Sequence, residues 1–124
     1  MTIEFFKKEG RGFAPKASVR MQGHIGFNRA AIDRFKIKNG QDVLLGYDRE
    51  HRMVVIKPVD EPEPGSKKTV VRGKNGSISA RGFFDYFEIP HKKGKSYLLE
   101  RDDKNKFLLF YLEEEKNLKE TERA

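Results

Sequence analysis

The sequence predicts a β-rich α+β protein whose two similar halves each contain one short helix. Three observations lead to this prediction. The chain of 124 residues carries an internal repeat, its apolar runs are short and bounded by turn residues, and each repeat is too small to bury its own apolar face. We therefore expect two tandem units, residues 17–58 and 69–112, to pack together about a pseudo-twofold axis.

The repeat aligns residues 23–37 with 76–89, and the following segments align at an offset of 54. Identical residues recur in the pairs Gly23 and Gly76, Ile25 and Ile78, Arg29 and Arg81, Gly40 and Gly94, and Asp48 and Asp102. Agreement in residue class over the whole length indicates a duplication. The duplication predicts buried positions at Ile25, Ile37, Leu45 and Val55, and at their equivalents Ile78, Ile89, Leu99 and Leu109.

The first unit begins with a basic strand at 17–21, a turn at Gln22-Gly23 and a short strand at 24–27. Asn28 is a good N-cap residue, so a short helix should follow it and end before Gly40. A hairpin then closes the unit, with strands at 43–47 and 53–56 around a polar turn.

The second unit repeats this order, with a strand at 69–72, a turn at Asn75-Gly76 and a strand at 77–79. Ser79 should cap the second helix, Pro90 should stop it, and a hairpin at 97–99 and 107–110 follows. The helix carries Phe83, Phe84, Tyr86 and Phe87. Helical spacing favours these rings as core over a base-stacking platform, with Phe83 or Tyr86 as an alternative oligomer contact.

A linker at 59–68 separates the units, because residues 58–66 (PVDEPEPGS) hold three prolines and three acids and should form neither a helix nor a central strand. An N-terminal arm at 1–16 precedes the first unit. A charged tail at 113–124 follows the second.

Residues 17–58 combine a glycine-marked turn and short strand at Gly23-His24-Ile25, a short helix, Ile37 before the turn at Gly40, and a hairpin ending in Ile56-Lys57-Pro58. In this combination the segment resembles the AbrB/SpoVT/MazE family of swapped-hairpin DNA-binding domains. Asn28 stands where the family usually has proline. The resemblance implies that two units interlock their hairpins in one small β-barrel, normally as a homodimer and here within one chain, an arrangement similar to that of MraZ.

The net charge is +7, and residues 10–32 and 64–84 contain no acidic residue. Blocks of one sign favour a polyanionic partner, with a plain solvated surface as the alternative. The family contacts DNA through its first strand and loop, which the resemblance places at Arg20, Gln22, Arg72 and Lys74. The full set of candidate DNA-binding residues is Arg11, Lys16, Arg20, Gln22, Arg29, Lys67, Lys68, Arg72, Lys74 and Arg81.

The chain has no cysteine, its three histidines are scattered, and no nucleotide-binding or catalytic motif is present. We therefore expect no enzyme, no cofactor and no metal. The N-terminus lacks the apolar stretch of a signal peptide and no apolar run approaches 18 residues, so we expect a cytoplasmic protein that does not enter a membrane. The sequence favours a regulator that binds double-stranded DNA in a prokaryote or phage. Alternatives are an adaptor for an acidic protein and an antitoxin-like regulator, and homo-oligomers stay open.

Overall fold

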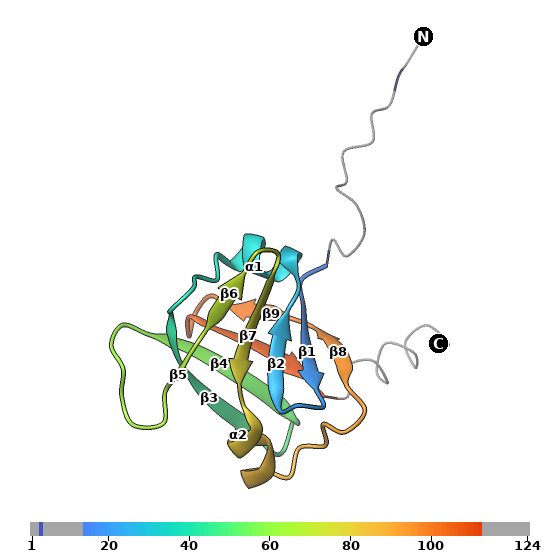
Figure 1. Ribbon diagram of the computed structural model, residues 1–124, viewed down its shortest axis with the longest axis vertical. Helices are drawn as coiled ribbons and strands as arrows, with labels where there is room; N and C mark the ends of the chain where they lie inside the picture. Colours follow the sequence, from blue (N-terminus) through green and yellow to red (C-terminus); the bar gives the residue numbers. More distant parts are fainter. Residues whose placement is uncertain (1–2, 4–13, 113–124) are drawn as a thin grey trace.

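The computed structural model describes residue 3 and residues 14–112, which form ten strands and two short helices (Figure 1). Most of the expected N-terminal arm, including the candidate Arg11, and the tail 113–124 lie outside the described residues. The first half contains β1 (Lys16–Arg20), β2 (His24–Phe27), α1 (Arg29–Phe35), β3 (Asp42–Asp48) and β4 (Met53–Val59). The second half contains β5 (Lys67–Lys68), β6 (Val70–Arg72), β7 (Asn75–Ser79), α2 (Arg81–Tyr86), β8 (Lys95–Leu98), β9 (Glu100–Asp102) and β10 (Phe107–Tyr111).

The strands form two five-stranded antiparallel sheets, which confirms the β-rich α+β class. The first sheet has the order β6-β7-β2-β1-β8, and the second has the order β5-β3-β4-β10-β9. Both sheets combine strands from the two halves. Equivalent residues of the repeat face each other across the central pairings, Ile25 opposite Ile78 and Val55 opposite Leu109. In Figure 1 the first sheet crosses in front of the second, with α1 at one end and α2 at the other.

The ladders of the described residues do not close into the single barrel that the resemblance implied. Instead, two stretches of chain pass from one sheet to the other at single buried residues, Thr69 between β5 and β6 and Leu99 between β8 and β9. Both residues stay hydrogen-bonded at these corners, because Thr69 N donates to Gln41 O at 2.8 Å and Leu99 N donates to Pro15 O at 2.9 Å. Such corners are how a strand serves two packed sheets.

The core lies between the sheets, where alternate side chains of the strands point inward. Ile25, Phe27, Ile78, Ile56 and Phe110 are almost fully buried, and burial of each such side chain contributes about 1.5–3 kcal/mol. Of the eight positions expected to be buried, Ile25, Ile78, Ile89, Leu99 and Leu109 are buried, and Ile37, Leu45 and Val55 are half-buried.

The two helices begin differently. Asn28 caps α1 as predicted, since its Oδ1 accepts from Ala31 N at 2.9 Å. The same side chain also accepts from Lys16 N at 3.0 Å, which ties the helix to β1. The expected cap at Ser79 is wrong, because this residue is still paired in β7 opposite His24. Ala80 occupies the cap position of α2 and makes no side-chain hydrogen bond there.

The aromatic residues of α2 are mainly core, as expected. Phe84 is fully buried, and Phe83 and Phe87 are half-buried against the core with their ring centroids 5.2 Å apart. Tyr86 is 75 % exposed and is the exception.

The turn predicted at Asn75-Gly76 is also wrong. Both residues belong to β7, and the chain reverses two residues earlier at Gly73-Lys74, where Gly73 has φ +60°. As a result, Val70 faces Ser77 in the way that Arg20 faces His24, so Val70 is the structural equivalent of Arg20. The β6–β7 hairpin then extends by two further residue pairs, and Arg72 lies near its tip.

The predicted linker is partly strand. Pro58 and Val59 belong to β4, a central strand of the second sheet, and Lys67–Lys68 form β5. Proline is accommodated because β4 pairs with β10 only through Met53–Ile56, so at Pro58 only the β3 side carries a ladder.

Candidate nucleic-acid interface

The strands of the first sheet carry no acidic residue. Their charged residues are Lys16, Arg20, Arg72 and Lys95, and all are basic. Lys16, Arg20 and Arg72 face outward, whereas Lys95 lies opposite the inward-facing Val19. The turn residues Met21–Gly23 and Gly73–Lys74, which join its two hairpins, add Lys74 and again no acid. The sheet therefore presents a positive surface that no carboxylate on its own strands neutralises.

A shallow hollow of about 450 Å³ lies on this surface, across strands from both halves. Arg20, Lys68 and Arg72 line it together with His24. Serine and asparagine side chains of β7 supply further hydrogen-bonding groups to the same hollow. The structure thus brings together three of the candidate residues from sequence positions that are up to 52 apart (72 minus 20).

Gly26 determines how Arg20 lies on this surface. A Cβ atom at residue 26 would overlap the Arg20 guanidinium, so the guanidinium lies directly over the backbone of β2. Arg20 is half-buried in this position. Glycine at residue 26 therefore leaves the space in which a planar, permanently charged group is held against the sheet.

The turns of the two hairpins carry further candidates, and each turn lies against the helix of the other half. Gln22 is exposed in the β1–β2 turn, and a Cβ at Gly23 would contact the Cβ of Arg81 at the start of α2. Lys74 is exposed in the β6–β7 turn, which Figure 1 shows beside α1. There a Cβ at Gly76 would lie 3.3 Å from Ile32 Cδ1 of α1.

Two other candidates form ion pairs in which a neighbouring carboxylate offsets their positive charge. Lys68 Nζ lies 3.0 Å from the nearly buried Asp42 carboxylate, and Arg29 Nε lies 3.4 Å from Asp33 on an exposed face of α1. Lys67 is exposed but belongs to the second sheet, opposite Val43.

Lys16 is exposed at the start of β1, opposite Leu98. It belongs to the first sheet but is absent from the hollow.

Sequence reasoning missed two residues of this surface. His24, set aside as isolated, lines the hollow opposite Ser79, and Gly26 provides the space for Arg20. The alternation in His24-Ile25-Gly26-Phe27 could have identified both residues from the sequence. Ile25 and Phe27 point into the core, so His24 and Gly26 must face outward.

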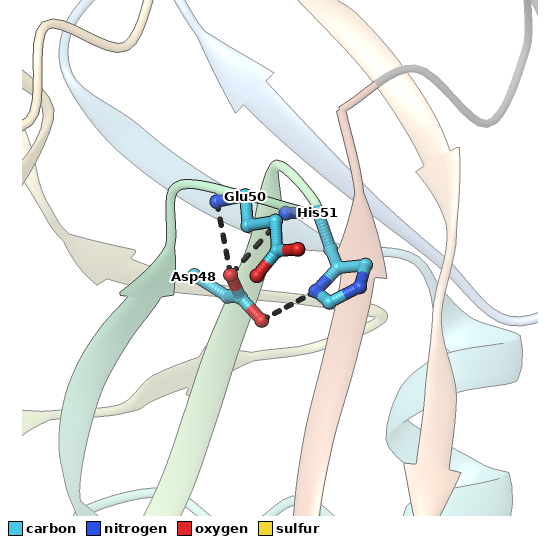
Figure 2. Close-up of side chains that lie close together, drawn as sticks. All are labelled: Asp48, Glu50 and His51. Atoms are coloured by element: carbon cyan, nitrogen blue, oxygen red, sulfur yellow. Dashed lines mark hydrogen bonds and ion pairs between the residues drawn. The ribbon is translucent and has the colours of Figure 1, made fainter.

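A cluster of Asp48, Glu50 and His51 in the β3–β4 turn brings three potential metal-binding side chains within 4.8 Å of one another (Figure 2). Asp48 Oδ1 accepts from the backbone N of Glu50 at 3.0 Å and of His51 at 3.2 Å, and its Oδ2 lies 2.8 Å from His51 Nδ1. The side-chain hydrogen bond between the two residues raises the pKa of His51. The same bond and the two backbone hydrogen bonds lower the pKa of Asp48.

The second half repeats this turn without the potential ligands. Asp102 Oδ1 accepts from the backbone N of Lys104 and Asn105, and its Oδ2 accepts from Asn105 Nδ2 at 2.9 Å. Lys104 and Asn105 stand where the first half has Glu50 and His51. The shared feature is an aspartate that closes a hairpin turn, which explains the cluster of Asp48 without a metal.

No family model matches this sequence, and neither a curated protein nor a solved structure matches it. Within the part of the chain that the structure describes, no helix has both the length and the apolar character needed to cross a membrane.

Proposed function

We propose that the protein binds double-stranded DNA through the outer face of its first sheet and acts, without catalysis, as a transcription regulator in the cytoplasm of a prokaryote or in a phage. The observation that carries this proposal is the hollow lined by Arg20 and Arg72 on a sheet whose strands hold no acid, with Lys68 of the second sheet also lining it. Cations fixed on one face bind phosphates and release the counterions of DNA, which is the main source of affinity for a duplex.

The arrangement of the two halves supports a tandem swapped-hairpin protein of the AbrB/SpoVT/MazE type. Strand β1 pairs with β8 of the other half, and β2 pairs with β7 through repeat-equivalent residues. A pseudo-twofold unit within one chain would present two similar hairpin turns to DNA, as a homodimer does. Twofold proteins commonly read palindromic sites, so the operator is expected to contain two related half-sites.

In this proposal, residues in the β1–β2 and β6–β7 turns recognise the DNA bases. Gln22, Arg72 and Lys74 lie in or beside the two hairpin turns, and their side chains are exposed. A two-stranded ribbon fits the major groove, where arginine pairs with guanine and glutamine with adenine. The longer β6–β7 hairpin reaches two residue pairs beyond its counterpart, and so the two turns would contribute unequally.

The test is fluorescence anisotropy of a labelled DNA duplex at several salt concentrations with the variant R72A/K74A. Loss of two phosphate contacts should weaken binding and flatten the salt slope by about two units. The matched control K57A/K104A removes the same charge from exposed positions of β4 and the β9–β10 turn, and it should leave the slope unchanged. Each exposed substitution should shift stability by under about 0.5 kcal/mol, which a melting curve checks.

Equal loss in the two variants would contradict the proposal, because attraction would then follow net charge alone. Absence of wild-type binding at low salt would also overturn it and favour the adaptor, in which the same basic face meets an acidic protein.

A further inference from the structure

Each half contains a hollow in the same place, between the end of its helix and the strands that follow, and the two differ greatly in size. The hollow of the first half has a volume of about 120 Å³ and is lined by Ile37, Lys38, Gln41, Val43 and Pro58. Their repeat equivalents, Ile89, Pro90, Lys95, Tyr97 and Leu112, line a hollow of about 930 Å³ in the second half. Only the larger one has the volume of a small-molecule site, which is typically about 300–1,000 Å³.

Two differences in the chain open the larger hollow. Strand β3 pairs with β4 over its whole length, from Asp42 opposite Val59 to Asp48 opposite Met53. In the second half, by contrast, the ladder to β10 involves only β9, and within the described residues β8 pairs with β1 alone.

The connection after the second helix is also longer. Ile89 and Gly94 are five positions apart (94 minus 89), whereas the equivalent Ile37 and Gly40 are three apart (40 minus 37). The added residues therefore lie in the segment that borders the larger hollow.

The wall of the larger hollow is apolar. Val19 comes from β1 of the first half, and Phe84, Ile89 and Tyr97 come from α2, the connection that follows it and β8. All four residues are buried. Pro90 and Leu112 add apolar surface to this wall that is still open to water. A ligand with an apolar body would cover that surface, and each square ångström removed from water contributes about 25 cal/mol.

Basic side chains surround this apolar wall. Arg52, Lys92, Lys93 and Lys95 line the hollow against two acids, Asp85 and Glu88, so the lining carries an excess of two positive charges (four minus two). His91 also lines it, and its Nδ1 is buried without a hydrogen-bond partner among the described residues. A buried polar atom of this kind is costly unless a bound group satisfies it.

We propose that the larger hollow is a binding site for a small organic anion with an apolar body, such as an aromatic carboxylate or sulfonate. The apolar wall holds the body of the ligand, and the lysines with His91 meet its charged group through charge-assisted hydrogen bonds. The site is separate from the basic hollow, because the two share no lining residue. Lys95 belongs to the first sheet, but it lies opposite the inward-facing Val19 and so faces the other side of the sheet from Arg20.

The probe for this site is 8-anilinonaphthalene-1-sulfonate, whose fluorescence rises in apolar surroundings. N-phenyl-1-naphthylamine serves as the comparison probe, because it has the same rings without the sulfonate. In the full chain the variant K92Q/K93Q/K95Q should weaken sulfonate binding about tenfold, which corresponds to 1.4 kcal/mol. The matched control K36Q/K38Q/K106Q removes three lysines from the lining of the small hollow and should leave affinity within about twofold.

Amide shifts in a ¹⁵N spectrum locate the probe. Binding should move the signals of Ile89 and His91 and leave those of Ile37 and Gln41 in place. Equal weakening by the two triple variants, equally tight binding of the uncharged probe, or absence of binding at about 1 mM sulfonate would overturn the proposal. Binding only in E113Q/E114Q/E115Q would also overturn it, because the acidic segment after Leu112 would then be the occupant.

Discussion

The two sheets contain the same number of basic strand residues, but only one of them is a positive surface. The first holds Lys16, Arg20, Arg72 and Lys95 with no acid, whereas the second holds Lys57, Lys67, Lys68 and Arg101 together with Asp42, Asp48, Glu100 and Asp102. The ion pair between Lys68 and Asp42 shows how acids in the second sheet neutralise neighbouring bases. A binding face for a polyanion is thus defined by where the acids are absent, which a net charge for the whole chain does not reveal.

Acids placed on the first sheet should remove this difference and have the largest effect. The variant S18E/S79E adds two carboxylates at positions that face outward on β1 and β7. Each one should cancel a phosphate-binding cation, and duplex affinity in about 0.1 M salt should fall roughly 100-fold. The matched uncharged variant S18Q/S79Q controls for side-chain size, and anisotropy measures both. A similar loss with glutamine would mean that shape, and not charge, is what the surface requires.

A smaller effect is expected from Gly26, which allows Arg20 to lie over β2. The variant G26A should displace the guanidinium while Arg20 remains in the sequence. R20A removes one phosphate-binding cation and should lower duplex affinity about tenfold in about 0.1 M salt. If Gly26 acts only through Arg20, R20A/G26A should bind no more weakly than R20A, so the two losses are not additive. Additive losses would show that Gly26 contributes to binding in some other way.

The sequence predicted the features that depend on local pattern. The order of strands and helices, the Asn28 cap and the first closing hairpin follow from turn residues and alternation over a few positions. The second closing hairpin, expected from strands 97–99 and 107–110, is wrong in its first strand. Residues 100–102 of β9 pair with β10, whereas Tyr97 pairs with Ala17 of β1. The turn of the β6–β7 hairpin was misplaced because Gly73-Lys74 and Asn75-Gly76 both suit a turn. The pairing of β7 with β2, a contact between the two halves, places Gly76 in the strand opposite Phe27, and Asn75 then pairs with Arg72 of β6.

Features that depend on packing between distant segments were not predictable in this way. The two corners at Thr69 and Leu99, the space over Gly26 and the larger hollow beside Tyr97 all arise where the two halves meet. For the candidate interface, acid-free stretches pointed to Arg20 and Arg72, but only the fold places His24 beside them.

The smallest effect is expected on the pH dependence of stability, which should differ between the two hairpin turns of the second sheet. An aspartate closes each turn, but its side-chain partner is His51 in one and Asn105 in the other. His51 donates to Asp48, which raises the pKa of the histidine above its usual 6.5, whereas Asn105 in the equivalent place does not titrate. Protonated His51 is therefore favoured in the folded chain. Its contribution to stability is complete below pH 6.5 and is lost as the pH rises through the raised folded pKa. An NMR titration should give His51 a pKa above 6.5 that D48N lowers. H51N should remove the pH dependence of the first turn near neutral pH, where the second turn has no titrating partner for Asp102. An unchanged His51 pKa in D48N would show that the exposed pair at this turn does not persist in solution.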